Sequence, residues 1–167
     1  MKKFSSLSLV VFGLALSLGA QAQVSKKDEE FMMKAAAGGL YEVQAGNLAQ
    51  EKATAANVKS FGAMLIKDHS MANEELKAMA SAKGVTLPTD LPADKKRRLE
   101  KISKAKDFDK QFVDEVGVND HKHDIQLFEK ASANADDPEL KAFAAKTLPT
   151  LVAHRQHAQS LKKTDGK

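Results

Sequence analysis

Apolar residues recur at intervals of three and four along most of the chain, the spacing of one face of an α-helix. The pattern predicts four long helices, at about residues 26–53, 55–83, 108–135 and 138–162. Ser25, Asp107 and Asp137 precede three of these segments and are residue types that cap helix N-termini. Thr54 is the candidate cap of the second helix, and Gly84 follows its C-terminus.

The connections between the predicted helices differ in length. Those after the first and third helices are short, so each of these helices forms an antiparallel hairpin with its successor. Residues 85–106 separate the hairpins and include Pro88, Pro92 and a predicted short basic helix at about 93–105. We therefore predict an all-α fold, an antiparallel four-helix bundle of the ferritin-like type with one long connector.

The first residues have the features of an export signal. Lys2 and Lys3 are followed by an apolar stretch at 7–18 and by Ala20-Gln21-Ala22, a small-x-small cleavage site. We expect 1–22 to be a signal peptide, 23–167 to be the bundle domain, and the mature protein to be periplasmic. No later apolar run is long enough to predict a transmembrane segment in the mature chain.

Composition and charge narrow the chemistry. Without Lys2 and Lys3, 24 basic residues face 22 acidic ones, a net charge of +2 that argues against nucleic acid as the partner. The sequence has no Cys, which excludes thiolate metal sites, iron–sulfur clusters and covalent haem. The basic stretch at 95–98 is interpreted as a solvated face, with contact to an anionic membrane surface or an envelope protein as the alternative.

Each long helix has one polar residue within its apolar stripe. The four are Glu42, His69, His121 and His154. Glu42 and His69 lie 12 and 15 residues from the turn near residue 54, so their depths differ by about 5 Å at 1.5 Å per residue. The same count from the turn near residue 136 gives about 5 Å for His121 and His154. We expect the four side chains to meet in one buried layer.

Such a layer has two interpretations. Imidazole nitrogens and a carboxylate oxygen suit one transition-metal ion, Zn²⁺, Fe²⁺, Cu²⁺ or Mn²⁺, with Asp68, Asp120 or Asp124 orienting an imidazole. Alternatively, the Glu42 carboxylate forms a closed polar network with a protonated histidine, or with Tyr41 and water, that needs no metal. No metalloprotease, phosphate-loop or nucleophile-elbow motif is present, and no catalytic residue is predicted.

The chain also resembles a bacterial exported ferritin-like domain family of unknown function, often labelled "predicted outer membrane protein". The resemblance covers about residues 28–161. The stretches that carry it are Phe31-Met32-Met33-Lys34-Ala35-Ala36 with Tyr41-Glu42-Val43, Val58-Lys59-Ser60-Phe61 with Met64 and Asp68-His69, Phe108-Asp109 with Asp120-His121, and Thr147-Leu148-Pro149 with His154. It implies a helical bundle and an envelope location, and it implies no established activity.

One departure from ferritin-like di-iron proteins limits the expected site. Those proteins carry Glu-x-x-His on two helices, whereas Ile66, Val118 and Leu151 stand three residues before the histidines here. A mononuclear site is therefore expected. The leading hypothesis is a periplasmic, stress-related metal-binding bundle. The alternatives are a non-catalytic structural or interaction module of the envelope and, third, an oxidoreductase that uses the bound metal.

Overall fold

The computed structural model describes residues 24–164, and the predicted signal peptide lies outside them. The regular elements in this part of the chain are α1 (Lys26–Lys52), α2 (Ala56–Ala82), α3 (Ala93–Ser103), α4 (Phe108–Phe112), the π-helix η1 (Val113–Asp120), α5 (His121–Asn134) and α6 (Pro138–Thr164). The predicted all-α class is confirmed. No helix among residues 24–164 is both long and apolar enough to cross a membrane.

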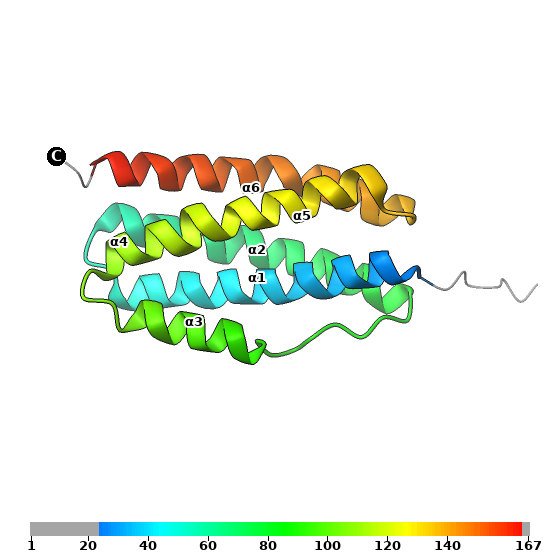
Figure 1. Cartoon of the computed structure of the whole chain (residues 1–167), viewed down its shortest axis with the longest axis horizontal. Helices are drawn as coiled ribbons and strands as arrows, with labels where there is room; N and C mark the ends of the chain where they lie inside the picture. The colour runs from blue at the N-terminus through cyan, green and yellow to red at the C-terminus, as the bar shows by residue number, and fades with distance from the viewer. Residues whose placement is uncertain (1–23, 165–167) are drawn as a thin grey trace, which may run out of the picture.

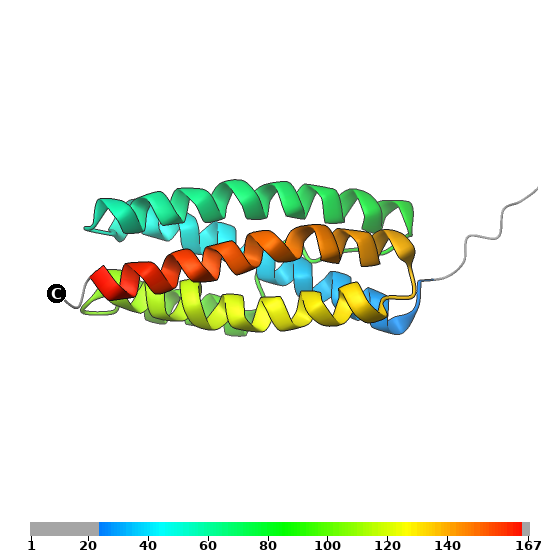
Figure 2. The ribbon, with the colours of Figure 1, turned by 90° about the horizontal axis from the view of Figure 1, so that it is seen from above.

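Four helical columns form the bundle, because α4, η1 and α5 follow one another as a single rod (Figure 1). α1 and α2 form one antiparallel hairpin, and the α4–η1–α5 rod forms the other with α6. Figure 2 shows that α2 and the rod run in the same direction. The chain between them must therefore return along the whole bundle, and it does so with α3 lying beside α1 (Figure 1). The long connector predicted from the sequence is confirmed.

Each helical hairpin is held by an aspartate that comes from the first turn of the first helix in the other hairpin. Asp28 on α1 accepts a 2.8 Å hydrogen bond from the backbone N–H of Asp137, where α6 begins. Asp109 on α4 accepts 3.1 Å and 2.8 Å bonds from the N–H groups of Thr54 and Ala55, where α2 begins. The prediction that Thr54 caps α2 is wrong, because its hydroxyl donates to Asp109 instead.

The buried apolar side chains form two clusters, one toward each end of the bundle. Phe61, Leu65, Phe112 and Val116 belong to the first, and Phe31, Leu76, Phe128 and Phe143 to the second. The buried polar residues Glu42, His69, His121 and His154 come from the helix segments between them. The predicted polar layer therefore divides the core.

The basic connector helix is bound to the bundle through its charges. Arg98 on α3 forms ion pairs with Asp120 and with Glu115 of η1. The ammonium group of Lys95 lies 4.7 Å from the centre of the Tyr41 ring, a cation–π contact. Two cations of the predicted solvated face thus help to hold α3 on α1 and the rod.

The third predicted helix differs from expectation in its middle. We predicted one α-helix at 108–135, but residues 113–120 adopt the wider π-helical turn. Gly117 lies inside it, and a Cβ there would approach Ala158 Cβ to 2.5 Å and Phe61 Cε1 to 3.0 Å. Close contact with α6 therefore accompanies the change of helix type. π-helical turns often occur at functional sites, and this one directly precedes His121.

Candidate metal centre

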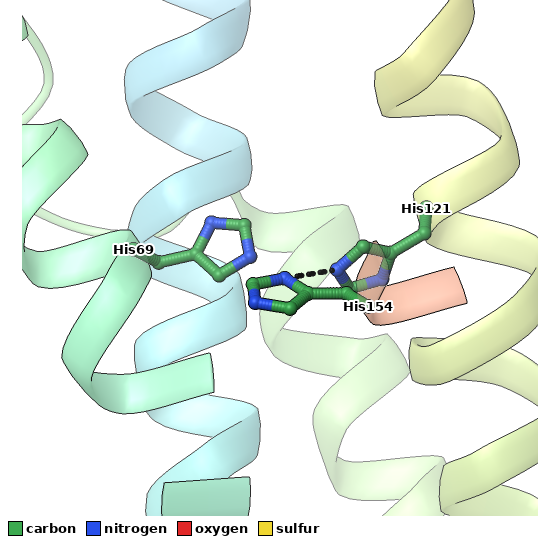
Figure 3. A group of neighbouring side chains, drawn as sticks. All are labelled: His69, His121 and His154. Carbon is green, nitrogen blue, oxygen red and sulfur yellow. Dashed lines mark hydrogen bonds between the residues drawn. The ribbon is translucent and has the colours of Figure 1, made fainter. Parts of the chain in front are cut away.

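Three histidines from three helices point toward one another in the polar layer. His69 comes from α2, His121 from the first turn of α5 and His154 from α6 (Figure 3). All three are buried. One ring nitrogen of each lies within 4.8 Å of the others, and their ring centres are 5.2–5.6 Å apart. The sequence prediction that these three residues meet is borne out by the geometry.

The outer nitrogens of two of these rings are hydrogen-bonded. His121 Nδ1 lies 2.9 Å from the carbonyl oxygen of Val116 in η1. His154 Nε2 lies 2.9 Å from Asp68 Oδ2 on α2. A carbonyl and a carboxylate only accept hydrogen bonds, so each of these outer nitrogens carries the proton. In a neutral imidazole the other nitrogen then has a free lone pair.

Those two free lone pairs face each other. His121 Nε2 and His154 Nδ1 are 3.2 Å apart, and two lone pairs at this distance repel unless a proton or a metal ion lies between them. Burial lowers the pKa of His121 to about 4. Burial also lowers the pKa of His154, although its contact with Asp68 acts in the opposite direction. Burial therefore disfavours a proton between the two nitrogens at neutral pH.

His69 completes the group, and one nitrogen of its ring makes no hydrogen bond. Its Nε2 is buried and has no hydrogen-bond partner. Burial lowers the pKa of His69 well below its usual value, and the neighbouring His121 and His154 lower it further. A buried polar atom without a partner is rare in a folded protein and calls for a ligand or a specific role. A neutral imidazole of this kind has a lone pair suited to metal binding.

Glu42, the fourth predicted ligand, lies in the layer but is separate from the three ring nitrogens. Its Oε1 is 3.9 Å from His121 Nδ1, the nitrogen bonded to Val116. Both carboxylate oxygens are buried without a hydrogen-bond partner. Burial, with Asp124 and Asp120 nearby, raises the pKa of Glu42. That Glu42 itself binds an ion stays a prediction.

Other acids surround this side of the centre. Burial raises the pKa of Asp124 to about 6, and burial likewise raises the pKa of Asp120 while its ion pair with Arg98 opposes the shift. Burial and then the charge of Asp120 raise the pKa of the Tyr41 hydroxyl. The layer is thus rich in acidic oxygen atoms on the α1 side.

The aromatic ring of Phe61 covers one side of the histidine group. The Phe61 ring centre lies 6.5 Å from that of His121 and 6.4 Å from that of His154. Phe61 also stacks on His157 at 5.4 Å. An apolar cover of this kind keeps water from the metal-binding nitrogens and lowers the local dielectric constant.

The residues fit a transition-metal ion. Metal–nitrogen bonds of about 2.0–2.1 Å bring two nitrogens on one tetrahedral ion to about 3.3 Å from each other, close to the 3.2 Å found for His121 and His154. Each of these rings also has the outer hydrogen bond that usually accompanies histidine ligation. Three imidazoles without thiolate suit zinc, copper or iron.

The sequence predicted the three clustered histidines more accurately than the groups that hydrogen-bond to their rings. Asp68, Asp120 and Asp124 were predicted to orient an imidazole, and Asp68 does so for His154 on another helix. The Val116 carbonyl was not predicted, and no sequence signal short of recognising the π-helix identifies it.

Comparison with known proteins identifies the family of this chain. The family described as "Domain of unknown function (DUF4142)" matches residues 14–161. The chain belongs to this family. The resemblance to a family of unknown function is thereby confirmed, whereas the family match does not support the ferritin-like and outer-membrane labels. No curated protein matches the sequence.

Several solved structures share the fold. A DUF305 fragment from Deinococcus radiodurans has a TM-score of 0.72 at 11% identity, covering 83% of this chain and 96% of its own. CopM in the Cu(I)-bound form has a TM-score of 0.70 at 15% identity, covering 82% and 96%. CopM in the Ag-bound form, obtained by soaking, has a TM-score of 0.69 at 16% identity, covering 85% and 97%. At these identities the likeness establishes the fold alone.

Proposed function

We propose that this protein binds one transition-metal ion, with copper as the foremost candidate, through His69, His121 and His154. The observation that carries the proposal is the pair of facing nitrogens of His121 and His154, 3.2 Å apart, whose outer nitrogens are engaged by acceptors. The unpartnered Nε2 of His69 supplies the third donor. The bound ion would relieve the lone-pair repulsion and give the buried nitrogen a partner.

The preference for copper rests on two supports. Neutral imidazoles are good ligands for both copper oxidation states. The structural neighbour CopM is described in Cu(I)-bound and Cu(II)-bound forms, which supports a metal-binding use of this bundle without identifying the ligands here. Zn²⁺, Fe²⁺ and Mn²⁺ are the competing ions, and the experiment below discriminates among them.

Glu42 serves this site as a fourth ligand or as a charge partner. Three neutral imidazoles leave the full charge of the ion uncompensated in a buried layer, which is unfavourable. The Glu42 carboxylate, 3.9 Å from His121, is the nearest fully buried acid. Its ionised form would offset the positive charge of the ion.

The proposed setting is the periplasm, where such a protein would hold metal under stress and limit free ions. This part of the proposal rests on the export signal predicted at residues 1–22. No catalytic step is proposed.

Metal analysis of the full chain, expressed with its own leader and purified from the periplasm without an affinity tag, tests the proposal. We expect about one equivalent of copper per chain, lost in His69→Ala and retained in His123→Ala. His123 is the matched control because it is an exposed histidine close to the centre in sequence. Addition of Cu²⁺ to the metal-free protein should raise its melting temperature, as binding to the folded state requires.

The opposite result is equally informative. Protein that contains no metal, and whose melting temperature is unchanged by Cu²⁺, Zn²⁺, Fe²⁺ or Mn²⁺, would overturn metal binding. The polar layer would then fix the register of the helices in a structural or protein-interaction module of the envelope. One equivalent of another metal would keep the site and reject copper.

A further inference from the structure

A small cavity lies beside His69, toward the second apolar cluster. Its volume is about 20 Å³, which is room for about one water molecule. All four columns of the bundle contribute to its wall, and the polar members of that wall are His69, Asn73, Asp124 and Thr147. It is therefore a mainly apolar space with four polar side chains in its wall, next to the proposed metal ligand.

The cavity brings partly exposed polar side chains next to the buried imidazole. Asn73, Asp124 and Thr147 are half-buried and reach solvent, whereas His69 is buried. The hydroxyl of Thr147 donates to the Phe143 carbonyl at 2.9 Å, which leaves its oxygen lone pairs available. The wall thus offers carboxylate, carboxamide and hydroxyl oxygens on the way from solvent to a histidine whose Nε2 has no hydrogen-bond partner.

Two consecutive glycines on α1 face these oxygens, and one of them makes room for Asn73. A Cβ at Gly39 would lie 1.9 Å from Asn73 Oδ1, and one at Gly38 would lie 3.5 Å from Asp124 Oδ1. A glycine within a helix destabilises it relative to alanine, so its presence calls for a structural reason. At Gly39 an alanine would displace Asn73, so glycine here keeps the carboxamide against α1 in the cavity wall.

Two other sides of the histidine group are occupied by neighbouring side chains. Phe61 packs over His121 and His154 from the opposite end. The outer edge of His154 is bonded to Asp68. On the side next to Asn73 and Asp124, a cavity meets His69.

We infer that this cavity is the path by which the ion reaches the histidine centre, with Asp124 and Asn73 as its transient ligands. The inference rests on the proposed function. A hydrated ion is larger than the space available, so the ion must exchange its water for protein oxygens as it enters. The Asp124 carboxylate in the cavity wall attracts the cation and raises its local concentration. The carboxamide of Asn73, one helical turn after His69 on α2, lines the same cavity.

A transient ligand affects the rates of metal binding and release rather than the affinity for the metal. A resident ligand changes the amount of metal held at equilibrium, whereas a transient one changes association and dissociation rates together. We expect Asp124→Asn, which keeps size and removes charge, to slow association about tenfold. The stoichiometry should stay at one ion per chain, and the affinity should change much less than the association rate. Asn73→Leu, which removes the oxygen and fills the space, should also slow association.

Stopped-flow absorption of the metal-free full chain mixed with Cu²⁺ measures these rates. Asp114→Asn is the matched control, because Asp114 is a half-buried carboxylate on the same rod that pairs with Lys110 and Lys162. Its rate should equal that of the wild type. Asp124→Glu should recover most of the rate, which distinguishes charge from packing. It also keeps the test valid if Asn73→Leu does not fold.

The possible results distinguish a failure of the proposed metal binding from a failure of the proposed entry path. Wild-type protein that takes up no Cu²⁺ overturns the proposed function and the path with it. Normal copper uptake with unchanged rates in Asp124→Asn overturns the path and leaves the metal centre standing. Loss of bound copper at equilibrium in that variant would also reject the path, because Asp124 would then be a resident ligand.

Discussion

Asp68 and His154 join α2 to α6 at the edge of the histidine centre, with Asp68 Oδ2 2.9 Å from His154 Nε2. Asp68 directly precedes His69 in the sequence, yet it orients the histidine of another helix. One short stretch of α2 therefore supplies a proposed ligand and the support of a second one. This contact sets the tautomer of His154 and directs its free nitrogen toward His121.

Replacing Asp68 with Asn should weaken metal binding without removing it. The amide keeps the size but loses the charge that stabilises the Nε2 proton of His154, and losses of about 10–100-fold are typical for such partners. Competition with a coloured copper chelator measures the change. Asp114→Asn is again the control and should bind like the wild type. Equal affinities for Asp68→Asn and the wild type would contradict the proposed role of Asp68.

The stability of the metal-free protein should depend on His121 between pH 6.5 and about 4. The folded protein holds this pKa at about 4, against 6.5 for an unperturbed histidine. Between these values the unfolded chain takes up a proton that the folded protein does not, so stability falls as the pH falls. The free energy of unfolding of the wild type should therefore decline relative to His121→Gln through this window.

Urea unfolding at pH 7 and pH 4.5, in the presence of a chelator, tests that expectation. His123→Gln is the control because His123 is exposed on the same helix, and its difference from the wild type should not vary between the two values. A pH-independent difference for His121→Gln would show that burial does not depress this pKa.

The sequence was most informative where helical spacing and turn position act together. The interruptions of the apolar stripes at His69, His121 and His154 could be counted from two short turns, and the three residues do meet. Glu42 could be placed in the same layer but not among the ring nitrogens. Spacing fixes depth along the axis, whereas the side of a ring that a carboxylate faces depends on helix rotation and rotamer.

The supports of the site depend on tertiary contacts that no local pattern encodes. Residues 113–120 have the same periodicity as the rest of the rod, so their π-helical turn could not be distinguished from an α-helix. The reciprocal caps by Asp28 and Asp109 were missed for a related reason. Each joins positions more than 50 residues apart, while capping rules consider neighbours within one turn.

Those caps should contribute measurably to stability. Asp28→Ala or Asp109→Ala leaves backbone N–H groups at the start of α6 or α2 without their acceptor, and each should lower the free energy of unfolding by about 1–2 kcal/mol. Urea unfolding measures the loss. Asp94→Ala, an exposed acid in the first turn of α3, is the control and should change stability by less than about 0.5 kcal/mol.

Substitution of Gly117 should affect both the fold and the centre. The Cβ of Gly117→Ala would lie 2.5 Å from Ala158 Cβ on α6, so the rod must shift, and overpacking of this kind costs about 1–3 kcal/mol. The shift moves the Val116 carbonyl that holds His121 Nδ1. Copper affinity should therefore fall together with stability.

Asn119→Ala, an exposed change in the same π-helix, is the control for both measurements. It should leave the free energy of unfolding and the copper affinity close to wild type. If Gly117→Ala loses stability but binds copper as tightly as the wild type, the orientation of His121 does not depend on the π-helical turn. If Gly117→Ala loses neither stability nor copper affinity, α6 does not lie as close to the rod as the contact between Ala158 and Gly117 indicates.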